Sequence, residues 1–74
     1  MFVTTHYLLG PRLEAARVAA GLSREQLAVD IGKSWATIRS YELGASTPPI
    51  TILCRLAAAL GVTVGELLDE RVSA

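Results

Sequence analysis

The chain has 74 residues, 51% of them hydrophobic and 19% charged, which is the composition of one small packed domain and not of a disordered tail. No apolar run reaches the roughly 18 residues of a membrane span, the N-terminus lacks the features of a signal peptide, and a single cysteine excludes an internal disulfide. The net charge is zero, but residues 1–55 hold six basic and four acidic residues whereas residues 56–74 hold one and three, so the two ends differ in sign.

The N-terminal residues 1–8 are expected to form an arm, and Phe2–Leu8 is the one stretch with a strand-like mixture of apolar and polar residues. The arm can cover the core, pair as a short strand with a partner subunit, or fray, and the three alternatives stay open. Its His6, the only histidine, is expected at the surface.

A first helix is expected from Pro11 to Ala20, because proline suits the first helical position and Gly21 suits a left-handed cap. Leu13, Ala16 and Ala20 share one face of this helix at helical spacing.

Two short helices follow, separated by a turn. Ser23 and Gln26 have the spacing of a capping box at the start of the second helix, and Gly32 ends that helix after two turns. Ser34 suits the cap of a third helix that runs to about Leu43. The side chains expected to face inward from these two helices are Leu27, Ala28, Ile31, Ile38 and Tyr41.

A loop at Ala45–Pro49, in which two prolines bar helix and sheet alike, leads to a fourth helix ending at Gly61 and a short fifth helix capped by Thr63. Cys54, on the fourth helix, is expected to pack semi-buried rather than to act as a redox sensor. The apolar positions at helical spacing in these helices are Ile50, Leu53, Leu56, Ala57, Leu60, Val64, Leu67 and Leu68. We therefore expect an all-α, compact five-helix domain over residues 9–70, followed by a tail at residues 71–74.

Two short helices joined by a glycine turn of three or four residues make a helix-turn-helix. The segment from Gly21 to Gly44 resembles the Cro/cI-type helix-turn-helix family, also called the XRE or lambda-repressor-like family. The residues that carry the resemblance within the motif are Gly21, Leu22, Ser23, Arg24, Glu25, Gln26, Leu27, Ala28, Ile31, Gly32, Ser34, Thr37, Ile38, Tyr41, Glu42 and Gly44. Those beyond it are Pro48, Ile50, Leu53, Leu56, Ala57, Leu60, Gly61, Val62, Thr63, Glu66, Leu67 and Leu68.

The resemblance covers about residues 9–68 and implies a fold in which the second and third helices form the helix-turn-helix. It also implies a bacterial or phage transcription regulator that binds double-stranded DNA, usually as a homodimer on a palindromic operator. In this family the third helix enters the major groove and the second lies across the backbone.

The resemblance implies base contacts at Trp35, Ala36 and Ser40, and Arg39 on the same face can pair with guanine or with a phosphate. Ala36 offers only a methyl group, which suits a thymine methyl. Trp35 departs from the family, which has a small or polar residue there. Its ring can pack on sugar and thymine methyls, mark a protein-contact surface, or lie partly buried against the turn.

Phosphate contacts are expected at Arg24, Lys33, Ser34, Thr37, Ala45 and Ser46. Arg24 stands where the family commonly has a glutamine and lies near a helix N-terminus, which attracts anions; the alternative is a solvated surface arginine. The contacts at Ala45 and Ser46 are implied through the backbone amides of the loop after Gly44. Leu43 and Ala45 replace residues that are often polar or basic in the family.

Arg17 and Glu42 match a basic and an acidic position that pair beneath the motif in this family. We expect the same structural pair here, which would keep Glu42 from repelling DNA.

The expected function is therefore a sequence-specific, cytoplasmic DNA-binding regulator, similar to Cro or to a small repressor and without enzymatic activity. No cofactor, metal ion or small-molecule effector is expected, because the sequence shows no set of catalytic or metal-binding residues and only about 14 residues remain outside the domain. The alternative is a protein-interaction module on the same fold, which the zero net charge, Trp35 and Leu43 favour. The fifth helix, the tail and the arm are all candidate dimer surfaces.

Overall fold

Five α-helices account for most of residues 6–68, the part of the chain that the computed structural model describes, with side chains from Leu9 onward. They are α1 (His6–Ala19), α2 (Arg24–Ile31), α3 (Trp35–Leu43), α4 (Ile50–Leu60) and α5 (Val64–Leu68). No strand occurs within this part of the chain, so the prediction of an all-α, five-helix fold is confirmed. None of these helices is long and apolar enough to cross a membrane.

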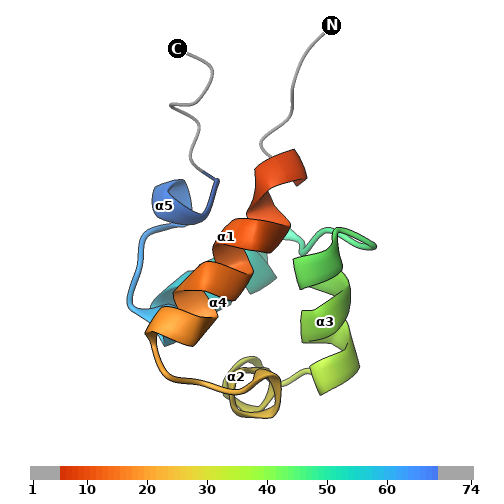
Figure 1. Ribbon diagram of the computed structural model, residues 1–74, viewed down its shortest axis with the longest axis vertical. Coiled ribbons are helices and arrows are strands. Elements are labelled where there is room, and N and C mark those ends of the chain that lie inside the picture. The colour runs from red at the N-terminus through yellow and green to blue at the C-terminus, as the bar shows by residue number, and fades with distance from the viewer. Residues whose placement is uncertain (1–5, 69–74) are drawn as a thin grey trace, which may run out of the picture.

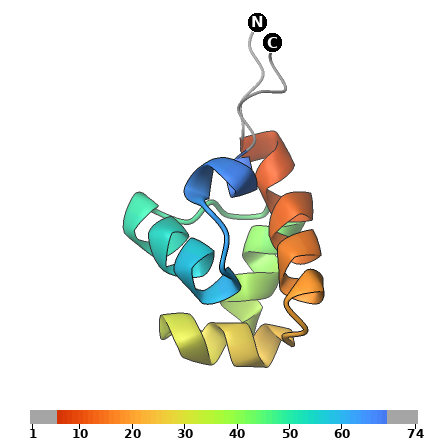
Figure 2. The same cartoon turned by 90° about the vertical axis from the view of Figure 1, so that its left-hand side faces the viewer.

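The helices surround a single core. α1 packs against α3 and α5, α2 packs against α3 and α4, and α4 packs against α5. α5 and the start of α1 lie at one end of the molecule, and α2 closes the opposite end (Figures 1 and 2). This arrangement leaves one long side of α3 uncovered by any other helix (Figure 1).

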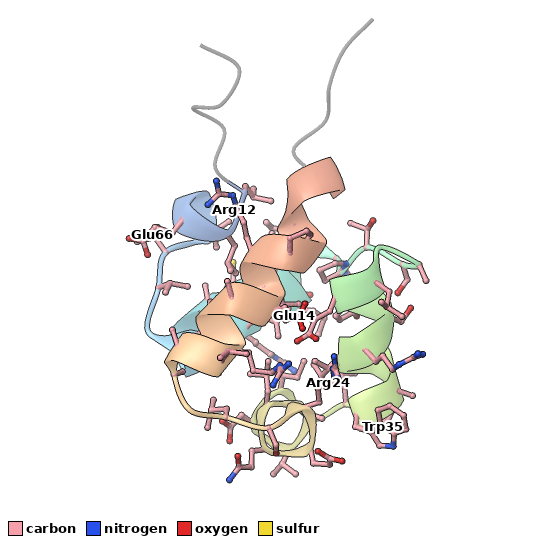
Figure 3. The ribbon with its side chains drawn as sticks, in the orientation of Figure 1. Arg12, Glu14, Arg24, Trp35 and Glu66 are labelled. Carbon is pink, nitrogen blue, oxygen red and sulfur yellow. The ribbon has the colours of Figure 1, made fainter. Side chains whose placement is uncertain are left out.

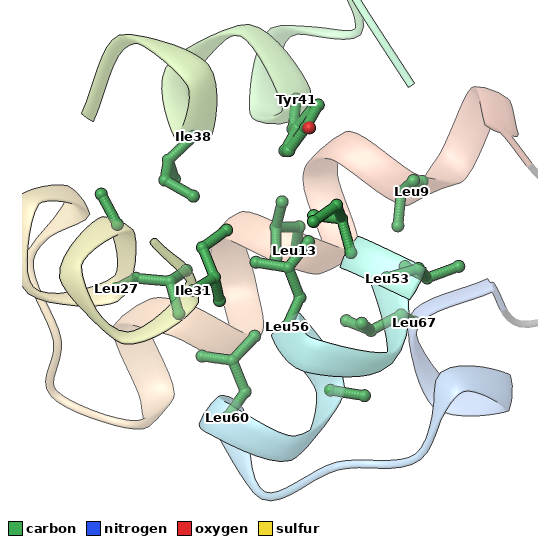
Figure 4. Packing of buried hydrophobic residues seen from close by; sticks show 13 residues of the cluster. Leu9, Leu13, Leu27, Ile31, Ile38, Tyr41, Leu53, Leu56, Leu60 and Leu67 are labelled. Carbon is green, nitrogen blue, oxygen red and sulfur yellow. The ribbon is translucent and has the colours of Figure 1, made fainter. Parts of the chain in front are cut away.

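Every helix contributes at least one fully buried side chain to the core (Figure 4). Those side chains are Leu13, Leu27, Ile31, Ile38, Leu56 and Leu67. Burial of one leucine or isoleucine contributes about 1.5–3 kcal/mol, whereas an isolated helix as short as α3 is marginal in water. The core therefore holds α3 in a helical conformation and fixes which of its sides faces outward.

α1 begins at His6, so the predicted start at Pro11 is wrong. The proline lies inside the helix, where it removes one backbone hydrogen bond close to the N-terminal end. Leu9, 3% exposed, and Leu13, fully buried, lie one turn apart on the same face, so the packing of Leu9 favours the earlier start. Residues 6–8, assigned to the arm and to a strand-like stretch, are helical, whereas residues 1–5 and the tail at 71–74 lie outside the described part.

Gly10 lets α1 cross α3 at close range. A Cβ at this position would overlap the backbone carbonyl of Glu42 and lie 3.1 Å from the carbonyl oxygen of Tyr41. Because both obstacles are backbone atoms, neither can swing aside as a side chain does. With the first helix expected from Pro11, Gly10 lay outside it, and no local signal in the sequence indicated this contact.

Three further burial predictions are wrong. Ala20 is exposed just past the end of α1, Ile50 is 64% exposed, and Cys54 is exposed. On α4 the buried stripe runs through Ile52, Leu53, Leu56, Ala57 and Leu60. Ile50 and Cys54 stand to the side of that stripe, because a helix turns by about 100° per residue.

Candidate nucleic-acid interface

α2 and α3 are joined by a short turn formed by Gly32, Lys33 and Ser34. Gly32 adopts a left-handed conformation (φ 72°), and the Lys33 amide donates to the Ala28 carbonyl at 2.9 Å, which closes the end of α2. The Ser34 hydroxyl accepts a hydrogen bond from the Thr37 amide and caps α3. The chain thus passes from one helix to the next in the geometry of a helix-turn-helix, with both predicted caps confirmed.

The start of α2 is fixed by the predicted capping box. The Gln26 amide donates to the Ser23 hydroxyl at 3.0 Å, and the Ser23 amide donates to the Gln26 side-chain oxygen at 2.7 Å. These two bonds place Arg24 at the first residue of α2, from which its side chain reaches Glu42 of α3.

α3 has a buried face and an exposed face. Ile38, Tyr41 and Glu42 are buried, as the sequence predicts for the first two. The exposed residues of the helix are Trp35, Ala36, Arg39 and Leu43. Figure 3 shows Trp35 at the N-terminal end of α3, projecting away from the core, and the residue is 49% exposed. We call these four residues the outer face of α3.

The predicted pair of Arg17 and Glu42 is present and buried. Arg17 Nε donates to Glu42 Oε2 at 2.6 Å, and its Nη1 donates to the Leu22 carbonyl at 2.9 Å. The hydrogen bond to Glu42, opposed in part by burial, raises the pKa of the Arg17 guanidinium above its ordinary value. Arg17 therefore stays charged and ties α3 to both α1 and the turn that precedes α2.

Arg24 also binds Glu42, a contact in addition to the predicted pair of Arg17 and Glu42. Arg24 Nε donates to Glu42 Oε1 at 2.9 Å, and its Nη2 lies 3.9 Å from a carboxylate oxygen of Glu14. No local spacing indicates this contact, because it joins residues of different helices. The Arg24 side chain is still 35% exposed, so part of the guanidinium remains open to solvent beside α3.

The negative charge of Glu42 is hidden from solvent. Its side chain is 1% exposed and accepts hydrogen bonds from two arginines. The cluster of Arg17, Arg24 and Glu42 carries one net positive charge, and the exposed member of the cluster is Arg24. Burial of Glu42 therefore removes one negative charge from the surface beside α3, where the exposed Glu14 lies close to Arg24.

The hydroxyl groups near the outer face are paired with one another. Ser34 Oγ lies 3.2 Å from Thr37 Oγ1, and Ser40 Oγ lies 2.8 Å from Ser46 Oγ. Each pair uses one of its two hydroxyl hydrogens internally. The structure thus brings these four predicted contact residues to the edges of the outer face, with fewer free donors than the sequence indicates.

The loop after α3 uses its first amides inside the protein. The Ala45 and Ser46 amides both donate to the Ser40 carbonyl, at 2.9 and 3.4 Å. Phosphate contacts through these two amides, as the resemblance implied, are therefore disfavoured, and Ser46 keeps only its exposed hydroxyl for that purpose. Lys33, in contrast, is exposed in the turn.

The described residues hold no group of three or more His, Cys, Asp or Glu side chains that could bind a metal ion. The arrangement offers an exposed helical face with one charged residue, Arg39, on it, with Arg24 and Lys33 nearby and a buried ionic cluster on the inner side of the helix.

A helix-turn-helix family model matches residues 13–67 of the sequence. This chain belongs to the XRE-type helix-turn-helix family. The family consists of DNA-binding regulators, which confirms the resemblance drawn from the motif and the functional class that it implies. No curated protein sequence matches this chain.

Three solved structures of other proteins share the fold of this chain. The restriction-modification controller protein C.AhdI from Aeromonas hydrophila is 34% identical, with a TM-score of 0.76 over 80% of this chain and 86% of its own. A hypothetical transcription factor, NHTF from Neisseria, is 28% identical, with a TM-score of 0.79 over 92% of this chain and 82% of its own. A chain of the SinR–SinI protein complex is 33% identical, with a TM-score of 0.78 over 88% of this chain and 64% of its own.

Proposed function

We propose that this chain is a sequence-specific regulator that inserts α3 into the major groove of double-stranded DNA. The observation that carries the proposal is the outer face of α3, which is exposed and is fixed from below by Arg17, Arg24 and Glu42. An α-helix fits the major groove of B-DNA, and a helix whose inner side is locked presents a constant set of side chains to it. The controller protein and the hypothetical transcription factor with the same fold support this function.

Each cation of the motif has a proposed role. Arg39 lies on the outer face and would pair with guanine O6 and N7. Arg24 and Lys33 flank that face and would meet phosphates, which position the helix without reading sequence. The hydroxyls of Ser34, Thr37 and Ser46 can add hydrogen bonds to the backbone.

We further propose that the protein acts as a homodimer on a palindromic operator in the bacterial cytoplasm, without a cofactor, small-molecule effector or catalytic activity. One α3 reads only a few base pairs, and two copies related by a two-fold axis would read half-sites about 34–36 Å apart.

A salt titration with a random-sequence duplex tests DNA binding. With about three or four phosphate contacts per protomer, log Kd should rise with log salt concentration at about 0.9 per contact. Arg24→Ala should reduce that slope, and Arg24→Ala combined with Arg39→Ala should abolish most of the binding. Arg55→Ala, which removes an exposed cation from α4, is the matched control and should leave the slope unchanged.

Absence of binding to the duplex at low salt would contradict the proposal, and so would an equal loss of duplex affinity in the Arg55 variant and the Arg24 variant. The second candidate function is a protein-interaction module, which the exposure of Trp35 (49%) and Leu43 (63%) on the outer face favours. If that function holds, Trp35→Ala would weaken the self-association of the protein measured by sedimentation, and neither the wild type nor the variant would bind duplex DNA.

A further inference from the structure

The outer face of α3 is poor in hydrogen-bonding groups for a surface that meets base edges. Of its four residues, Arg39 alone carries a charge, and Trp35 adds a single indole N–H; Ala36 and Leu43 are apolar. The hydroxyls at its edges are already paired, Ser34 with Thr37 and Ser40 with Ser46. Each of these pairs keeps one hydroxyl hydrogen for another partner, so apart from Arg39 and the indole N–H the four residues of the outer face offer mainly apolar contact.

The major groove presents one apolar group at its base edges, the C5-methyl of thymine. Trp35 and Ala36 stand side by side in the first turn of α3, the end of a recognition helix that reaches the bases. Leu43 lies eight residues further on, about 12 Å along the helix axis, and therefore at the edge of the groove.

We propose that Trp35 and Ala36 read thymine C5-methyl groups, with Arg39 supplying the polar base contact one turn away; this inference rests on the proposed DNA-binding function. Trp35 and Arg39 are four residues apart, about 6 Å along α3, which corresponds to roughly two base pairs. Each half-site should therefore contain thymine within about two base pairs of a guanine.

The test begins with duplexes selected by the wild-type protein from a random pool. Each thymine of the selected site is then replaced singly by uracil, which removes the C5-methyl group and keeps every hydrogen-bonding group of the base. Burial of one methyl group corresponds to about fourfold in affinity, so uracil at a contacted position should raise Kd about fourfold. Uracil outside the half-sites should leave Kd unchanged.

Two variants assign the effect to residues. Trp35→Ala should bring the ratio of uracil-site to thymine-site Kd close to one at the position that the ring contacts. Arg39→Ala should weaken binding to both duplexes and leave that ratio near four. Trp35 is half-exposed and outside the core, and a circular-dichroism melt checks that each variant is folded.

The possible outcomes distinguish thymine-methyl readout from DNA binding itself. Sequence-specific binding that is indifferent to every uracil replacement, or a selected half-site without thymine, overturns methyl readout and leaves DNA binding intact. A ratio that Trp35→Ala does not change overturns the role of Trp35. No binding to any duplex overturns both the inference and the proposed function.

Discussion

The carboxylate of Glu42 accepts hydrogen bonds from Arg17 of α1 and from Arg24 of α2. Three helices are therefore joined at one buried charge, directly beneath the helix proposed to read DNA. A buried ion pair adds little net stability compared with apolar packing, but removal of one partner leaves an uncompensated charge. The cluster consequently fixes the orientation of α3 and makes the fold sensitive to each of its members.

Arg17→Ala should lower the free energy of unfolding by about 3 kcal/mol, because Glu42 loses the partner that is buried with it. In a domain of this size that corresponds to a drop in Tm of roughly 12–24 °C. Arg24→Ala removes a partner of the same carboxylate that is about one-third exposed, and should lower the free energy of unfolding by about 1 kcal/mol or less. Equal losses in the two variants, measured by urea unfolding, would show that Arg17 is not the main anchor.

The raised pKa of Arg17 also determines the pH dependence of this contribution. A cation whose pKa is higher in the folded than in the unfolded state stabilises the fold at every pH below its unfolded pKa, and loses that contribution only as pH rises through the folded pKa. The titration of Arg17 should thus cause no change between about pH 6 and pH 9 in the difference between the free energies of unfolding of wild type and Arg17→Ala. Urea unfolding of both proteins at several pH values measures this difference in free energy.

Glu14 moderates the charge of Arg24, because their side chains approach to 3.9 Å and both are partly exposed (Figure 3). Glu14→Gln should therefore tighten binding to a random duplex at low salt by about twofold to fivefold, an effect that added salt screens. Glu66→Gln makes the same change of charge on α5, away from the motif, and should leave Kd unchanged. A similar gain in both variants would show that only the net charge matters.

At the scale of the elements, the crossing of α1 over α3 depends on Gly10. Gly10→Ala should destabilise the protein by at least about 1–3 kcal/mol, because the added methyl meets the backbone of α3. Gly65→Ala, in α5, is the matched control: its Cβ would lie 3.8 Å from the Thr63 hydroxyl, and the gain in helix propensity should stabilise the fold by up to about 1 kcal/mol. If urea unfolding shows Gly10→Ala to be neutral, the close crossing is absent.

The elements of the motif could be predicted because their signals are local. Ser23, Gln26, Gly32 and Ser34 determine where α2 and α3 begin and end through hydrogen bonds to neighbours in the sequence. The start of α1 could not be predicted in this way, because the packing of Leu9 against distant helices outweighs the preference of Pro11 for a helix start.

The candidate site was predictable in outline and not in its hydrogen bonds. Helical spacing separates the inner from the outer side of α3, and the family resemblance supplied the pair of Arg17 and Glu42. The attachment of Arg24 to Glu42 and the pairing of Ser40 with Ser46 depend on how side chains meet in three dimensions. These contacts decide which predicted groups remain free to bind DNA.

At the scale of the whole molecule, zero net charge is compatible with DNA binding because the charges are unevenly exposed. Because Glu42 is buried, the exposed or partly exposed residues of α2, the turn and α3 carry three positive charges (Arg24, Lys33 and Arg39) against two negative ones (Glu25 and Asp30). Acidic residues become more frequent toward the C-terminal end of the sequence, in the part that follows α4. Attraction to phosphate should therefore be local and modest, which leaves specificity to the outer face of α3.

The most direct test of the central claim is a titration of ¹⁵N-labelled protein with the selected duplex, followed through its amide chemical shifts. The account predicts that the largest changes occur at residues 24–47, strongest at Trp35, Ala36 and Arg39, and that the exposed side of α4 around Cys54 and Ala58 changes little. Changes concentrated on α4 or α5, with α3 unaffected, would contradict the claim that α3 is the DNA-reading helix.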